Sequence, residues 1–177
     1  MGIGKRRVTR NITPVCKFDA RSGEMNRCDR EQDSNGTWHT KQVDITETFE
    51  AIVDLENMEI GWIAFPPGGQ PDFRMVPVGT DVGEPPTDNH KEGFRLQMKL
   101  TNGAGDDIRE FASTSKMVWQ SLDELHDEYL EGCVKHKGKL PIVGIAEVAK
   151  VHTGSGTHYR PIFEITGWAK RPSDLAK

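Results

Sequence analysis

The residues of this chain whose types could do chemistry are aromatic rings and basic groups placed along strand-like segments. Binding a single nucleic-acid strand needs flat rings on which bases stack, each worth on the order of 1–3 kcal/mol, and a basic groove that follows the phosphates. We interpret twelve residues as candidates for such a role: the rings of Trp62, Phe73, Tyr159 and Trp168, and the basic groups of Arg95, Lys99, Lys150, His152, His158, Arg160, Lys170 and Arg171.

The densest group of candidates flanks the polar tip 153–156 of a predicted hairpin near the C-terminus. A flexible basic hairpin that carries an aromatic residue suits a protein that folds over a nucleic-acid strand. Tyr159 and Phe163 share the parity that faces the core, so we expect Phe163 to be buried and Tyr159 to be exposed only through its place near the tip. Trp62 and Phe65 have opposite parities, so at most one of them is expected to be free for stacking.

Catalytic and metal-binding motifs are nearly absent. The chain has no nucleophile elbow, P-loop, dinucleotide fingerprint or zinc helix. Cys133 and His136 have metal-like spacing, but Cys16 and Cys28 have no neighbouring ligand, and buried packing is the commoner role of such cysteines. The polar residues at 88–90 and 106–107 could form a metal cluster for phosphodiester hydrolysis, although Asp and Asn are also ordinary turn formers. We expect no enzyme, cofactor or metal, and a metal-dependent nuclease remains the least favoured alternative.

The charge of the chain is unevenly distributed. The 177 residues hold 23 Lys and Arg against 27 Asp and Glu, a formal charge of −4. Residues 1–45 carry 9 basic and 6 acidic groups, residues 46–131 carry 6 and 18, and residues 132–177 carry 8 and 3. Basic ends around an acidic middle indicate an anionic partner if the fold brings the ends together. We therefore expect the two ends to converge on one side and the acidic face of the helix to point the other way.

Length and composition favour one domain in a reducing compartment. A chain of this size can bury a core without disulfides or metals, and three cysteines are the wrong number for a disulfide scaffold. No apolar run approaches the roughly 20 residues of a membrane span, and no signal peptide is recognised. We predict a cytoplasmic protein with no membrane contact, in which a basic arm (1–11) precedes a single domain (12–177).

Hydrophobic periodicity predicts a mainly β fold with one helix. Residues 94–101 alternate most cleanly, with a wet face that carries Arg95 and Lys99. The spacing of apolar residues predicts a helix over 115–131 that ends at Gly132. A long Pro- and Gly-rich loop with one short strand (73–78) is expected over 66–91. The remaining predicted strands cover 12–18 and 25–33, paired as a hairpin, then 38–45, 49–55, 59–65, 108–112, 140–152 and 157–168.

The order of these elements resembles that of the OB-fold, a five-stranded Greek-key barrel, here elaborated by extra hairpins. In that fold a helix stands between the third and fourth strands, and the hairpin after it contacts ligand. The predicted series of strands 94–101 and 108–112, helix 115–131 and hairpin 140–168 matches that order.

Several short segments of the chain stand out together: Val53-Asp54-Leu55-Glu56-Asn57, Glu59-Ile60-Gly61-Trp62, Gly93-Phe94-Arg95-Leu96, Gly138-Lys139-Leu140-Pro141-Ile142-Val143, and Tyr159-Arg160-Pro161-Ile162-Phe163-Glu164-Ile165 with Gly167-Trp168 and Arg171-Pro172. These segments are similar to those of phage and prophage OB-fold proteins that coat single-stranded DNA during replication and recombination. The similarity covers most of residues 45–175 and implies a non-enzymatic, sequence-tolerant single-stranded DNA-binding protein. Related phage proteins often end in an acidic tail that recruits replication partners, whereas this chain ends Ser-Asp-Leu-Ala-Lys.

The partners implied are single-stranded DNA and, through the resemblance, phage or host replication and recombination proteins in a bacterial cell. Edge strands of such barrels often pair, so the sequence leaves a homodimer open. The main alternative is a protein-binding or regulatory β module that uses the acidic middle and the loop 66–91 as its interface.

Overall fold

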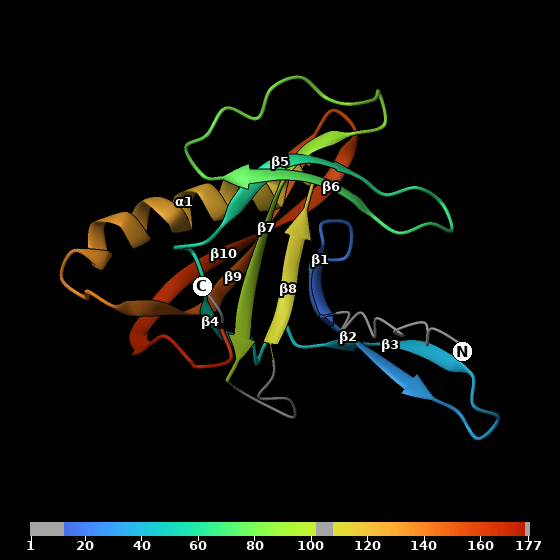
Figure 1. Ribbon diagram of the computed structural model, residues 1–177, viewed down its shortest axis with the longest axis horizontal. Coiled ribbons are helices and arrows are strands. Elements are labelled where there is room, and N and C mark those ends of the chain that lie inside the picture. Colours follow the sequence, from blue (N-terminus) through green and yellow to red (C-terminus); the bar gives the residue numbers. More distant parts are fainter. Residues whose placement is uncertain (1–12, 102–107, 176–177) are drawn as a thin grey trace, which may run out of the picture.

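The computed structural model describes residues 13–101 and 108–175, and the predicted basic arm lies outside them. Within this part the chain is mainly β with one long helix, as predicted (Figure 1). In chain order the elements are β1 (Val15–Asp19), β2 (Glu24–Gln32), β3 (Trp38–Asp44), β4 (Glu50–Val53), β5 (Glu59–Ala64), β6 (Asp72–Pro77), β7 (Lys91–Leu100), β8 (Ile108–Ser113), α1 (Lys116–Cys133), β9 (Lys139–Thr153) and β10 (Gly156–Lys170).

The strands form one open mixed sheet in the order β10-β9-β4-β7-β8-β1-β2-β3, and β5 pairs with both β7 and β6. Neighbouring strands are antiparallel except β1 and β8, which run parallel. The sheet curls so that β10 approaches the end of β1. The backbone N–H of Tyr159 in β10 donates a hydrogen bond to the carbonyl oxygen of Ala20, directly after β1, at 2.7 Å. A Cβ on Gly23 would lie 3.0 Å from the Tyr159 ring, so the β1–β2 turn packs closely on the β9–β10 hairpin.

Two hairpins project to the same side of the view in Figure 1, away from α1. One is β2–β3, in which β3 is exposed along nearly its whole length and, among the described strands, pairs only with β2. The other is β5–β6 with its connecting loop. Arg109 of β8 holds β2 in place, because its guanidinium donates to the Cys28 carbonyl at 3.0 Å and pairs with Asp29 at 2.8 Å.

The core lies inside the curled sheet and under the helix. Phe94, Leu96, Met98 and Leu100 of β7 are all buried, which confirms the predicted alternation. The buried face of α1 carries apolar residues at the predicted spacing, from Val118 to Tyr129, and the helix packs mainly on β10. No helix in the described residues is both long enough and apolar enough to span a bilayer.

The helix begins as predicted, but its end corrects the prediction. The Ser115 side chain caps it by accepting a hydrogen bond from the Val118 N–H. Gly132 lies inside the helix, which continues to Cys133, and a Cβ there would come within 2.4 Å of the Trp168 ring. The glycine therefore serves the close approach of an indole from β10, a reason that the local pattern could not reveal.

Changing Gly132 to alanine is expected to lower the free energy of unfolding by up to about 2 kcal/mol. Overpacking costs roughly 1–3 kcal/mol, whereas the better helix propensity of alanine returns about 1 kcal/mol. Chemical denaturation measures the change. Gly154→Ala at the β9–β10 tip is the control, because nothing lies within 4 Å of its added Cβ. A more stable Gly132→Ala variant would show that the indole is not held in this position.

Candidate nucleic-acid interface

The outward face of β7 continues across the neighbouring strands. The register places Gln97 of β7 beside Glu110 of β8, and Glu110 beside Val15 of β1. Arg95 therefore points to the face opposite the core, as its alternation with Phe94 and Leu96 predicts. Its guanidinium Nε lies 3.0 Å from the Glu110 carboxylate, which fixes the direction of the arginine side chain.

Two phenylalanines lie against this arginine and form what we call the aromatic–arginine cluster: Phe65, Phe73 and Arg95. The Arg95 guanidinium stands 4.4 Å from the centre of the Phe73 ring, in a cation–π contact. Phe65 meets Phe73 edge to face, with ring centres 6.5 Å apart. Phe65 remains 54% exposed. The cluster thus presents an open ring surface whose second ring is backed by a fixed positive charge.

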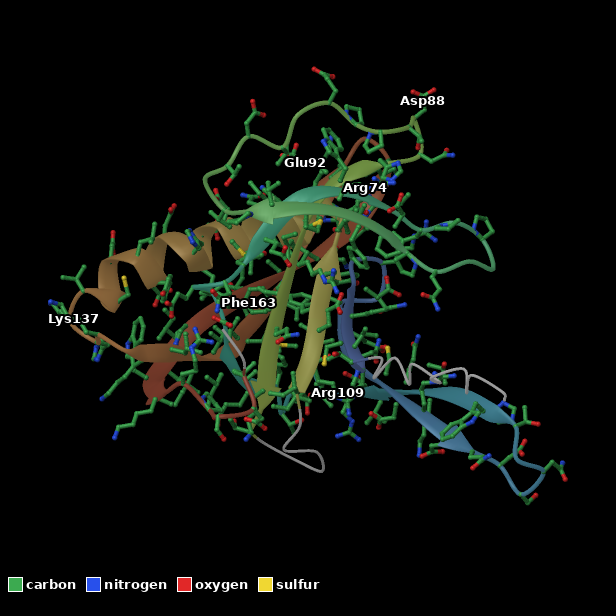
Figure 2. The ribbon with its side chains drawn as sticks, in the orientation of Figure 1. Arg74, Asp88, Glu92, Arg109, Lys137 and Phe163 are labelled. Carbon is green, nitrogen blue, oxygen red and sulfur yellow. The ribbon has the colours of Figure 1, made fainter. Side chains whose placement is uncertain are left out.

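One exposed cation shares the face of the cluster: Lys91 of β7 lies beside Ile63 of β5, and Ile63 lies beside Phe73 of β6. Arg74, labelled in Figure 2, follows Phe73 on β6, so its side chain leaves the opposite face of the sheet. Arg74 contacts Asp72 at 3.1 Å, but its side chain keeps 62% of its exposure. Phe65 and Arg74 were not among the twelve predicted residues. Phe65 lies just after β5, where strand parity no longer defines a side.

Trp62 is half-buried, and its indole N–H is used within the chain. It donates to the carbonyl oxygens of Val82 and Gly83 at 3.1 and 3.2 Å. The ring thereby ties the loop 78–90 to β5. This loop is the acidic, proline-rich segment that arches over β5 and β6 in Figure 1.

His90 ties the same loop to β6. The buried imidazole lies 2.7 Å from Thr87 Oγ1 and 3.0 Å from Asp72 Oδ2, so both ring nitrogens have partners. Hydrogen bonds from Arg74 and His90 hold the pKa of Asp72 below its ordinary value. His90, one member of the predicted metal cluster at 88–90, instead fastens the loop to β6. Asp106 and Asp107, the other predicted members, lie outside the described residues. Across the ranges 13–101 and 108–175, no three His, Cys, Asp or Glu side chains are grouped to hold a metal.

The tip of the β9–β10 hairpin gathers five of the predicted residues. Lys150 and His152 are exposed, while His158, Tyr159 and Arg160 are half-buried. Tyr159 packs against the hydrophobic core. Arg160 forms a 2.9 Å ion pair with Glu124 of α1, which corrects the expectation that the acidic face of the helix points away from the basic hairpin.

Trp168 is held by packing near the far end of β10. Its ring is stacked on His136, with centres 4.6 Å apart, and on Tyr129 at 6.0 Å. Lys170, two residues further on, is exposed. Trp168 is therefore enclosed by the helix and the segment that follows it, at some distance along the strand from the hairpin tip.

Arg171 is held by carboxylates. It contacts both Asp54 oxygens at 2.8 and 2.9 Å and Glu56 at 2.8 Å. Burial alone would raise the pKa of Asp54, but hydrogen bonds from Arg171 and Asn57 lower it overall. The Asp54 hydrogen bond in turn raises the pKa of Arg171. Lys99 is similarly paired with Asp174 at 3.1 Å. The structure thus divides the predicted residues between the cluster, the hairpin tip and this second end of β10.

A further exposed ring lies on the β2–β3 ribbon. Trp38 begins β3, and the guanidinium of Arg30 lies 5.7 Å from the centre of its ring. The flanking residues of β3 are polar on both faces, which is the signal that could have marked this tryptophan as exposed. It repeats the pairing of an aromatic ring with arginine on a second projecting hairpin.

Comparisons with protein-family models, with curated proteins and with solved structures find no match to this chain. The candidate site offers exposed rings, paired and exposed cations, and hydrogen-bonding groups on a curled sheet.

Proposed function

We propose that this protein binds single-stranded DNA without strong sequence preference and without catalysing a reaction. The observation that carries the proposal is the aromatic–arginine cluster on the outer face of the sheet. A base can stack on the open Phe65 ring, and neighbouring cations can meet the phosphates on either side of it. Lys91 is an exposed cation on the same face of the sheet as Phe73, with Ile63 of β5 between them in the register.

We propose further that the fold is an elaborated OB-fold. The elements β4 with β5, then β7, β8, α1, β9 and β10 follow the strand and helix order of that barrel. The hydrogen bond from Tyr159 to Ala20 supports a nearly closed path of strands, with β1 lying between β8 and β10. In this proposal β2–β3 and β5–β6 are additions that flank the binding face.

The proposal assigns unequal roles to eight of the twelve predicted residues. Phe73 and Arg95 belong to the stacking surface, and Lys150 and His152 provide a second contact from the hairpin tip. Trp62 positions the loop beside the surface. Trp168, Arg171 and Lys99 act as scaffold, since each is engaged by partners within the chain.

Binding is expected to prefer a single strand over the matched duplex and to weaken steeply with salt. Each neutralised phosphate of a single strand contributes a slope of about −0.7 in log K against log salt, so three contacts give about −2. Fluorescence anisotropy with a labelled oligonucleotide, titrated at several salt concentrations, measures this slope. A salt-insensitive complex, or no binding at low salt, would contradict the proposal and favour the protein-binding alternative.

A further inference from the structure

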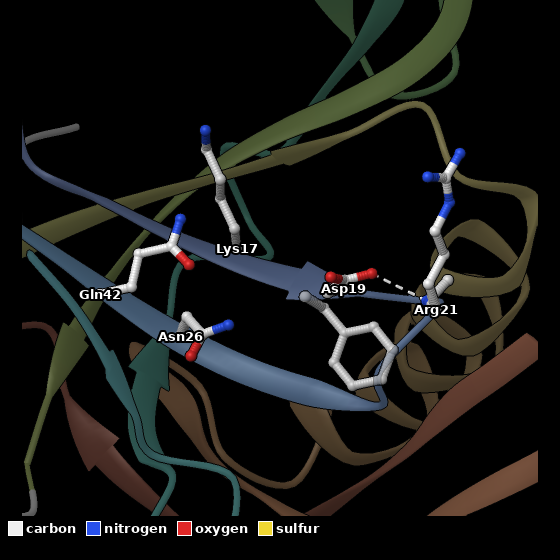
Figure 3. Close-up of a pocket in the computed structure, with 7 residues that line it drawn as sticks. Lys17, Asp19, Arg21, Asn26 and Gln42 are labelled. Carbon is white, nitrogen blue, oxygen red and sulfur yellow. Dashed lines mark hydrogen bonds between the residues drawn. The ribbon is translucent and has the colours of Figure 1, made fainter. Parts of the chain in front are cut away.

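A small hollow lies on the β1–β2–β3 side of the sheet, apart from the aromatic–arginine cluster. It has a volume of about 340 Å³, at the lower end of the range typical of small-molecule sites. Figure 3 shows Lys17, Asn26 and Gln42 grouped at one end, Arg21 at the other and Asp19 between them. The lining residues are Lys17, Phe18, Asp19, Ala20, Arg21, Asn26 and Gln42.

Most polar side chains of this hollow form no hydrogen bond with the rest of the described chain. Asn26 is only 8% exposed, and its side-chain amide forms no hydrogen bond with any described residue. The amide atoms of Asn26 stay open to solvent at the hollow, where their donors and acceptor are available to a ligand. Gln42 and the Lys17 ammonium also lack partners within the described ranges, and Asp19 uses one carboxylate oxygen to accept the Arg21 backbone N–H at 2.8 Å.

The register explains why these side chains meet. Lys17 of β1 lies beside Asn26 of β2, and Gln42 of β3 lies beside Cys28, two residues further along β2. The residues at these positions share the face that Glu110 and Arg95 occupy on β8 and β7. Neighbouring strands are about 4.8 Å apart, so the hollow continues the proposed binding face across the sheet from the cluster.

The chemistry of the hollow matches a nucleobase better than a lone anion. Each of the two amides offers a donor and an acceptor, as the edges of bases require. Lys17 and Arg21 can meet phosphates at the two ends of the hollow. Asp19, in the middle, would repel a phosphate there, but its carboxylate can accept from an exocyclic amino group, as acidic side chains do from cytosine.

We propose that this hollow is a subsite for one unstacked base that carries an exocyclic amino group, with Asp19, Asn26 and Gln42 contacting its edge. The inference rests on the proposed function. It adds a preference for cytosine or adenine over thymine at one position of an otherwise sequence-tolerant strand.

Homopolymers of deoxycytidine and deoxythymidine of equal length test the subsite, because both are pyrimidines that differ at the amino position. The wild-type protein is expected to bind the cytosine strand at least roughly fivefold more tightly, within the discrimination that one well-made base contact provides. Asp19→Ala and Gln42→Ala are expected to reduce this ratio to about twofold or less. Asn26→Ala is a third variant, with thermal melting as a check on its folding.

Gln120→Ala, at an exposed position on α1, is the matched control and should keep the wild-type ratio. Equal binding of both strands by the wild type, or a ratio that Asp19→Ala leaves intact, overturns the subsite and leaves the proposed function standing. Binding of neither strand at low salt overturns both. A preference for thymine contradicts the assigned role of Asp19.

Discussion

Arg171→Ala is expected to lower the free energy of unfolding by about 3 kcal/mol while leaving the DNA affinity of the folded protein within about twofold of wild type. The side chains of Asp54 and Arg171 are 3% and 15% exposed. Removing one partner of a buried pair costs about 3–5 kcal/mol, because the other charge stays buried without compensation. Asn57 continues to donate to Asp54 in the variant, which places the loss at the lower end.

Chemical denaturation at neutral pH measures this loss, and Arg74→Ala is the matched control. Arg74 pairs with Asp72 on the surface, where such pairs contribute about 0–1 kcal/mol. Weakened DNA binding by a fully stable Arg171→Ala protein would contradict the scaffold role and return Arg171 to the binding site.

The same pair makes the difference between wild type and variant depend on pH. The folded pKa of Asp54 lies below its unfolded value of about 3.9. The pair therefore stabilises the fold fully above that pH, and this contribution is lost as the pH falls through the lowered pKa. The stability difference between wild type and Arg171→Ala should accordingly shrink in acid.

Phe65→Ala is expected to weaken oligonucleotide binding by about 1–3 kcal/mol, or roughly 5- to 150-fold, with the melting temperature nearly unchanged. The ring is mostly exposed, so its removal takes away a stacking surface and leaves the core intact. Phe73 is the poorer choice for this experiment, because it also supports Arg95.

Leu130→Ala is the control for loss of an exposed apolar side chain, since Leu130 is 50% exposed on α1. Equal affinity of Phe65→Ala, Leu130→Ala and wild type would remove the cluster from the interface. A large fall in melting temperature would instead assign Phe65 to folding.

Local periodicity was enough to predict most of the secondary structure. The alternation from Phe94 to Leu100 and the spacing from Val118 to Tyr129 identify β7 and α1, since a single buried face imposes each pattern. The turn residues around Gly23 and at 153–156 likewise mark the hairpins. Gly132 shows the limit of this reasoning, because its role depends on an indole that arrives from β10.

The site was harder to predict, because contacts with residues distant in the sequence engage some of its cations and leave others exposed. Arg171 and Asp54 are 117 residues apart, and Arg160 meets Glu124 on another element. No pattern within a window of ten residues distinguishes such an arginine from a free one. The hollow was missed for the same reason, since β1, β2 and β3 supply its amides and charges together.

The seam between Tyr159 and Ala20 has a consequence for how binding and folding are coupled. In the described chain one backbone hydrogen bond joins these segments, and such a bond is worth about 1 kcal/mol net. Parting the two sides costs this bond and also the close packing of the Gly23 turn on the Tyr159 ring. A strand of DNA that touched both Arg21 and Lys150 would act as a staple across this seam and would add its own binding free energy to the resistance of the sheet to opening.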